Sequence, residues 1–171
     1  MDNRTKYTQK IIYETFMDLL KEKDIDKITV TEICKKAEIN RATFYRYYEN
    51  QYDLLDKIEE NMLDEIKNTT KNCKRDIDEL TLNILEVVYQ NKSEWIILTG
   101  THSDGRLVPQ IYRFFSKYFK RETLSKWNDY KYSFIFYGYS GIINEWTKNG
   151  FKETPQDLSN YLKKLRIKIV K

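Results

Sequence analysis

The short stretch from position 41 to 47 contains five side chains that can form hydrogen bonds with a partner: Arg41, Thr43, Tyr45, Arg46 and Tyr47. An arginine at the start of a helix can offer two donors to guanine in the DNA major groove, and threonine can offer a hydroxyl and a methyl group. Tyrosine hydroxyls suit phosphates, which position a protein on DNA without reading sequence. The pattern predicts a helix that reads DNA; the alternative is that Tyr45 and Tyr47 are ordinary surface aromatics.

The neighbouring residues predict the helices that would hold these groups. Thr29 can cap a preceding helix, with a glutamate three residues on to complete a capping box. Residues 38–40 then form a short turn whose last residue, an asparagine, caps the next helix. Phe44 and Tyr48 lie four residues apart and should pack inward. Asn50 caps a third helix. Two short helices joined by a tight turn, the second rich in donors, are typical of a helix-turn-helix.

The stretch TVTEICKKAEINRATFYRYYENQYDLL, residues 29–55, resembles the DNA-binding signature of the TetR family of bacterial transcription regulators. In that signature a short helix is followed by a polar-Arg-small-Thr-aromatic-Tyr run and then by a further helix. One departure is Gln51, where the family commonly has a lysine, and this favours a weaker phosphate contact. The residues expected at the DNA are Thr29, Thr31, Lys36, Asn40, Arg41, Thr43, Tyr45, Arg46, Tyr47 and Gln51.

Composition predicts an all-α protein. The 171 residues include only two prolines and five glycines, and they are long enough to bury a core. Apolar residues recur at helical spacing over 5–23, 50–68, 76–90, 92–100, 106–124, 129–149 and from 155 onward. We expect about nine helices, with a three-helix DNA-binding head over 1–50 and a regulatory and dimerisation body over 51–171.

Charge is unevenly spread along the chain. Residues 51–100 hold 6 basic and 11 acidic side chains, whereas residues 101–171 hold 14 and 6. A basic run over 106–131 would suit an anionic effector or partner, although a solvated face explains it as well. Charge alone would therefore point to the wrong end of the chain for DNA binding.

No catalytic constellation is evident. Cys34 and Cys73 lack metal or redox spacing, and His102 is the single histidine of the chain, in a predicted turn. We therefore expect no enzyme activity, no metal and no cofactor. No run approaches the ~20 apolar residues of a membrane span, and the N-terminus has no apolar signal core, so a cytoplasmic location is expected.

The C-terminal region, FIFYGYSGIINEWTKNGFKETPQDLSNYLKKL, resembles that of one TetR subgroup, which includes regulators of dihydroxyacetone-kinase operons. The resemblance implies that its two helices form the usual dimer surface of the family. Gly138 and Gly141 are costly inside a helix, which indicates a close backbone approach. The residues expected at the dimer interface are Phe134, Gly138, Gly141, Ile142, Leu158, Tyr161, Leu162 and Leu165.

Large aromatics in the middle of the chain leave two interpretations open. They can line an apolar effector pocket, as in TetR relatives, or form a solid helical core. The predicted ligand-binding residues are Tyr89, Trp95, Phe114, Tyr118, Tyr137 and Trp146. The subgroup includes members thought to work through a protein partner, which favours a body without a pocket.

These observations predict a dimeric, sequence-specific transcription regulator, acting as a repressor on a palindromic operator of double-stranded DNA. In such a dimer, one spacing of the two DNA-binding heads fits the operator. A small-molecule or protein effector that binds better to a dimer with a different head spacing would release the operator. The resemblance implies that the helix over 50–68 links the head to the body, so that movement of this helix changes the spacing of the two heads. The alternative is a co-regulator of the same fold that acts through a protein partner without a small ligand.

Overall fold

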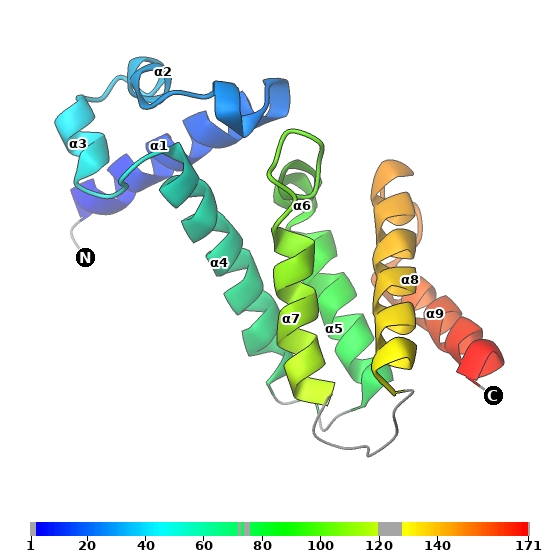
Figure 1. Cartoon of the computed structure of the whole chain (residues 1–171). Coiled ribbons are helices and arrows are strands. Elements are labelled where there is room, and N and C mark those ends of the chain that lie inside the picture. The colour runs from blue at the N-terminus through cyan, green and yellow to red at the C-terminus, as the bar shows by residue number, and fades with distance from the viewer. Residues whose placement is uncertain (1–2, 72, 74–75, 120–127, 171) are drawn as a thin grey trace. The chain divides into compact units, whose positions relative to one another are not determined.

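The computed structural model describes residues 3–71, 73, 76–119 and 128–170, with side chains at all of these except 3, 117–119, 128–129 and 169–170. This part of the chain is all-helical, as predicted (Figure 1). It contains nine α-helices and one 3₁₀ helix: α1 Asn3–Glu22, η1 Ile25–Lys27, α2 Val30–Lys36, α3 Arg41–Tyr45, α4 Gln51–Thr70, α5 Ile77–Gln90, α6 Lys92–Leu98, α7 Leu107–Phe119, α8 Asn128–Lys148 and α9 Pro155–Val170. None of the described helices combines the length and apolar character that crossing a bilayer requires.

Two compact units make up the chain. Unit 1, the head unit, contains residues 1–62 and 93–106, and unit 2, the body unit, contains residues 63–92 and 107–171. The boundary differs from the predicted one at position 50, because the first part of α4 and all but the first residue of α6 pack with the N-terminal helices. Helix α4 therefore contributes residues to both units.

Inside the head unit, α2 packs on α1 and α3 packs on α2 (Figure 1). Apolar side chains on the facing surfaces are fully buried, among them Phe16, Leu20, Ile33 and Phe44. The predicted caps are formed. The Thr29 hydroxyl oxygen accepts a hydrogen bond from the Glu32 amide at 3.2 Å, as the first half of a capping box requires.

The turn between α2 and α3 requires a left-handed backbone at Glu38, whose φ is +53°. The amide of Ile39 donates to the carbonyl of Cys34 at 3.0 Å, the 6→1 hydrogen bond of a Schellman motif. Glycine adopts this conformation without strain, whereas an L-residue pays roughly 1–2 kcal/mol. Glu38 is therefore a locally strained residue in the turn that sets the angle between the two helices.

Replacing Glu38 with glycine should raise the free energy of unfolding by about 0.5–1 kcal/mol, because the relief of strain exceeds the entropy that glycine adds to the unfolded chain. Urea unfolding at pH 7 measures this change. Glu38→Ala is the matched control, since it removes the charge and keeps a β-carbon. An equal gain in both variants would show that the charge, and not the backbone, is the source of the strain.

The segment 93–106, most of α6 and the loop after it, contacts the N-terminal helices through side chains and backbone. Glu94 forms a hydrogen bond with Tyr13 of α1, which together with burial raises the pKa of that phenol. The backbone carbonyl of His102 accepts from the amide of Ile25 at 3.1 Å, and its ring Nδ1 lies 2.6 Å from an Asp24 carboxylate oxygen. His102 thus joins this loop to the α1–α2 connection.

In the body unit, α9 packs along α5 and α7 along α8 (Figure 1). Asp78 on α5 receives Arg166 at 2.6 Å and Lys163 at 2.8 Å, both from α9. These cations hold the pKa of Asp78 below its usual value, although its partial burial acts in the opposite direction. Helix α9 begins as predicted, with Pro155 at its first position and the Thr154 hydroxyl oxygen accepting from the Asp157 amide at 3.1 Å.

Candidate nucleic-acid interface

Helix α3 presents opposite faces to the core and to solvent. Phe44 is fully buried and Tyr48, just beyond the helix, is 9% exposed, so both aromatics pack inward as predicted. Arg41 and Tyr45 lie on the exposed side, and the Tyr45 ring is 56% exposed. This ring stands edge-on to Phe44, with the two centroids 5.8 Å apart. The buried face fixes the helix, and the exposed face offers its donors to a partner.

Arg41 is held at the junction of the two helices of the motif. Its Nη2 donates a hydrogen bond to the hydroxyl oxygen of Thr31, near the start of α2. Both residues are exposed. A long arginine side chain loses rotamer entropy on binding, so a contact that restricts it beforehand lowers that cost. Thr31 therefore orients the guanidinium group that is the best candidate for reading a base.

Two of the predicted contact residues serve first as helix caps. Thr29 caps α2, and the side-chain oxygen of Asn40 accepts from the Ala42 amide at 2.9 Å to cap α3. Thr43 and Tyr47 are half-buried, and the Tyr47 ring leans against Tyr48 with centroids 6.4 Å apart. Tyr45 is thus the more accessible of the two tyrosines expected at phosphates.

The start of α4 borders this surface. Asn50 caps α4, because its side-chain oxygen accepts from the amides of Tyr52 and Asp53 at 2.9 and 3.0 Å. Gln51, the first residue of α4, is half-buried, and Arg46 in the preceding turn is exposed. The Tyr52 hydroxyl donates to Asp26 of η1 at 2.7 Å, which fixes this helix start against the α1–α2 connection.

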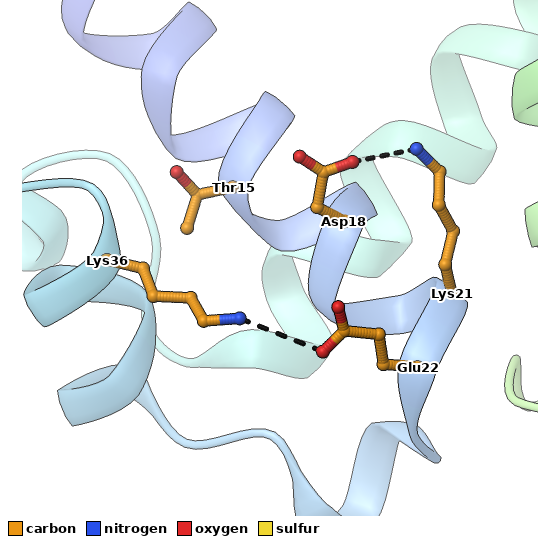
Figure 2. A pocket seen from close by; sticks show the side chains of 5 residues that line it. All are labelled: Thr15, Asp18, Lys21, Glu22 and Lys36. Atoms are coloured by element: carbon orange, nitrogen blue, oxygen red, sulfur yellow. Dashed lines mark hydrogen bonds and ion pairs between the residues drawn. The ribbon is translucent and has the colours of Figure 1, made fainter.

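Lys36 lies at the end of α2 and points across to α1. Figure 2 shows its ammonium group directed towards Glu22, at 3.8 Å. Both side chains are largely exposed, so the pair contributes little and does not fix Lys36 in place. The two residues line a hollow of about 400 Å³ together with Thr15, Asp18 and Lys21. The lining carries both signs of charge and no large apolar side chain, unlike the apolar effector pocket that the sequence suggested.

The residues predicted to bind a ligand belong to both units. Trp95 is buried in the head unit. In the body unit, Tyr89 stacks on Trp146 at 5.9 Å, and the indole of Trp146 donates to the carbonyl of Glu153 at 3.0 Å. Tyr137 stacks on Tyr112, with ring centroids 5.2 Å apart.

Phe114 and Tyr118 are the remaining two residues predicted to bind a ligand. Phe114 packs edge-on against Phe115, with ring centroids 5.0 Å apart. The side chain of Tyr118 lies outside the described residues, as do those of Lys117, Lys120, Arg121 and Lys126 in the basic run.

The predicted dimer residues divide into exposed and buried groups. Leu158 is 6% exposed and Leu162 is fully buried, since both face the interior of the body unit, where α9 packs on α5. The apolar spacing along α9 at these two positions therefore serves the core of the subunit. Ile142 and Leu165 are half-buried, and the exposed members are Phe134, Gly138, Gly141 and Tyr161.

A carboxylate cluster in the head unit was missed by sequence reasoning. Oxygen atoms of Asp56 and Glu59 on α4 and of Asp104 in the loop after α6 lie within 4.8 Å of one another. Arg106 donates hydrogen bonds to Asp56 and Asp104, so a guanidinium group supplies positive charge to the cluster. Glu59 is fully buried, and its burial and the charge of Asp104 raise its pKa to about 7.

One sequence signal could have revealed Glu59. It lies four residues after Leu55 and three before Met62, so helical spacing places it on the apolar face of α4. A carboxylate at such a position is rarely buried without a partner. The partners themselves were not visible, because Asp104 and Arg106 come from a distant loop.

The capped helices, the buried α3 face and its exposed donors define a helix-turn-helix DNA-binding protein. Two family models match the chain: residues 12–58 match the bacterial regulatory proteins of the tetR family, and residues 75–168 match a transcriptional regulator C-terminal region. The chain belongs to the TetR family of transcription regulators. Since this is a family of regulators and not of enzymes, the prediction of no enzyme activity is confirmed.

Individual relatives agree with this assignment. The chain is 44% identical over 61 residues to the HTH-type dhaKLM operon transcriptional activator DhaS of Lactococcus lactis, a match that covers 36% of this chain and 33% of that protein. The chain thus spans about a third of this relative. It is 26% identical over 121 residues to the HTH-type transcriptional regulator YxbF of Bacillus subtilis, covering 66% of this chain and 30% of that one.

A solved structure shows the same fold along nearly the whole chain. The TetR transcriptional regulator of Streptococcus agalactiae superposes with a TM-score of 0.70 at 22% identity, covering 96% of each chain. This likeness shows the fold.

Proposed function

We propose that this regulator binds a palindromic operator as a homodimer. The observation that supports this is the exposed face of α3, where Arg41 and Tyr45 project opposite the buried Phe44. A helix of this kind fits one major groove, and a two-fold dimer would place a second copy one helical turn away. Arg41 would read a base, and Tyr45 and Tyr47 would contact phosphates.

The dimer surface that we propose lies on α8. Phe134 is 59% exposed, and Gly138 and Gly141 follow it at helical spacing on the exposed side. A β-carbon added at either glycine would meet no atom within 4 Å in the described part of this chain. Each glycine costs the helix roughly 1 kcal/mol relative to alanine. Close approach of a second copy offers a physical reason for both glycines and for the exposed ring.

Replacing Phe134 with aspartate should separate the dimer into monomers, because a charge at the centre of an apolar interface is left desolvated without a partner. Sedimentation of the purified protein at micromolar concentration measures the mass. Operator affinity should fall at least tenfold, since each head then binds alone. Ile96→Asp is the matched control: Ile96 is 48% exposed but lies on α6 of the head unit. A dimeric Phe134→Asp variant would contradict the assignment.

Regulation is proposed to pass through α4, which contributes residues to both units. An effector or protein partner that binds one conformation of the body better than the other would shift the population of DNA-competent dimers. The aromatic side chains of the body unit remain the predicted place for such a ligand.

Repression follows if the operator overlaps a promoter. Activation is the second candidate, because the similar protein from Lactococcus lactis is named as an operon activator. An operator can be obtained by selecting bound sequences from random double-stranded DNA. A reporter gene placed behind this selected operator, with and without the regulator, decides between repression and activation.

A further inference from the structure

Lys57, on the second turn of α4, contacts the end of the recognition segment, by which we mean residues 41–47. Its Nζ donates a hydrogen bond to the backbone carbonyl of Tyr47 at 2.9 Å and to a carboxylate oxygen of Asp53 at 2.9 Å. The same ammonium group lies 5.0 Å from the centroid of the Tyr48 ring. One side chain of α4 therefore contacts the last residue of the recognition segment, Tyr47, and the residue that follows it, Tyr48.

A cation at this place fixes the turn that follows a short helix. Helix α3 is only five residues long and ends at Tyr45, and the Tyr47 carbonyl lies two residues beyond it, in the connection to α4. A positive charge near the carbonyl end also favours the helix dipole. Tyr48, on which the ammonium group rests, is 9% exposed, so this end of the segment is fixed to the core as well as to α4.

Asp53 holds Lys57 in the position that this contact requires. Its carboxylate accepts from the Glu49 amide at 2.9 Å, within the turn that joins the recognition segment to α4. The hydrogen bonds from Lys57 and from that amide lower the pKa of Asp53, so it is ionised at neutral pH. Hydrogen bonds thus connect the Glu49 amide, the Asp53 carboxylate, the Lys57 ammonium group and the Tyr47 carbonyl.

We propose that Lys57 is a positioning residue for DNA recognition: it fixes the carbonyl end of residues 41–47, and with it the direction in which Tyr45 and Tyr47 face the DNA. This inference rests on the proposed operator binding. Lys57 acts through the segment and does not itself contact phosphate. Because α4 continues into the body unit, the same contact joins the DNA-reading element to the helix that leaves the head.

The test compares Lys57→Met, which keeps much of the aliphatic stem, with Lys57→Arg, which keeps the charge. Lys67→Met is the matched control, since Lys67 is also on α4 and pairs with Asp64 at 2.7 Å. Fluorescence anisotropy measures binding to the selected operator and to a scrambled duplex over a range of salt concentrations. Hydrogen exchange of the amides of residues 44–50 is measured in the absence of DNA.

For Lys57→Met we expect about a tenfold loss of operator affinity, the size of a lost charged hydrogen bond. The loss for the scrambled duplex should be smaller, and the salt dependence unchanged. Amides of residues 44–50 should exchange faster, with the melting temperature within about 2 °C of the wild type. Lys57→Arg should restore affinity, and Lys67→Met should behave like the wild type.

Other results overturn the proposal. A salt slope reduced by about one, with equal losses on both duplexes, would show that Lys57 contacts a phosphate directly. Unchanged hydrogen exchange in Lys57→Met would show that the contact does not hold the segment, whatever the DNA result. Absence of operator binding by the wild-type protein overturns the proposed function instead, and the exchange measurement still decides the role of Lys57.

Discussion

Replacing Glu59 with glutamine is expected to stabilise the protein by about 3 kcal/mol at pH 8 and to leave it nearly unchanged at pH 4.5. The pKa of Glu59 is about 7 in the folded protein against 4.5 for an ordinary glutamate. Each pKa unit corresponds to about 1.36 kcal/mol. Glutamine has the shape of the protonated acid and carries no charge to bury.

The direction of the pH effect follows from proton uptake. Below pH 4.5 the group is protonated in both the folded and the unfolded protein, so the environment of Glu59 costs nothing extra. Between pH 4.5 and 7 the unfolded chain loses this proton while the folded protein retains it, and stability falls with rising pH. Above pH 7 both states are ionised, and the full penalty of burying the Glu59 charge, close to Asp104 and Asp56, remains.

Urea unfolding at several pH values from 4.5 to 8.5 measures this difference. The wild type and the Glu59→Gln variant should converge at the acidic end and diverge steadily towards neutral pH. Glu60→Gln is the matched control, because Glu60 is the next residue of α4 and is exposed. Parallel curves for the wild type and Glu59→Gln, or a variant that is less stable at pH 8, would contradict the raised pKa.

Local features of the fold were predictable from the sequence. Thr29, Asn40, Asn50 and Pro155 stand at helix starts in the structure because each signal acts within a few residues of the chain. The inward direction of Phe44 and Tyr48 followed from their helical spacing for the same reason. The helix-turn-helix could be located from sequence alone, because the caps and apolar positions that define it are close neighbours in the chain.

Contacts between distant segments were not predictable. Asp24 and His102 are 78 residues apart, and Asp78 and Arg166 are 88 apart. No periodicity relates such residues, so the sequence placed His102 in a turn but did not predict its contact with the α1–α2 connection. Leu162 shows the same limit: its apolar spacing predicted a buried face but did not tell whether α5 or a second copy covers it.

Replacing Arg41 with alanine is expected to relax the preference at one base position in each half of the operator, at a cost of about 1–3 kcal/mol. The structure strengthens this expectation, since Thr31 already orients the guanidinium group at the junction of α2 and α3. Removing only the Tyr45 hydroxyl, as in Tyr45→Phe, should weaken binding to all sequences about equally, because a phosphate contact carries no sequence information.

Competition binding against operators with single base changes separates these two effects. The Arg41→Ala variant should lose discrimination at one position, and Tyr45→Phe should keep the wild-type order of preferences. Equal losses of affinity for both variants, on operator and scrambled duplexes alike, would contradict the assignment of base recognition to Arg41 and phosphate contact to Tyr45.

Selection of bound sequences from a random pool of double-stranded DNA, with purified wild-type protein at moderate salt, tests the central claim most directly. We predict a two-fold-symmetric consensus whose half-sites are about one helical turn apart. The Arg41→Ala protein, selected in parallel, should return the same consensus with one position per half-site degenerate. A folded, dimeric wild-type protein that enriches no sequence would contradict the account of an autonomous DNA-reading head.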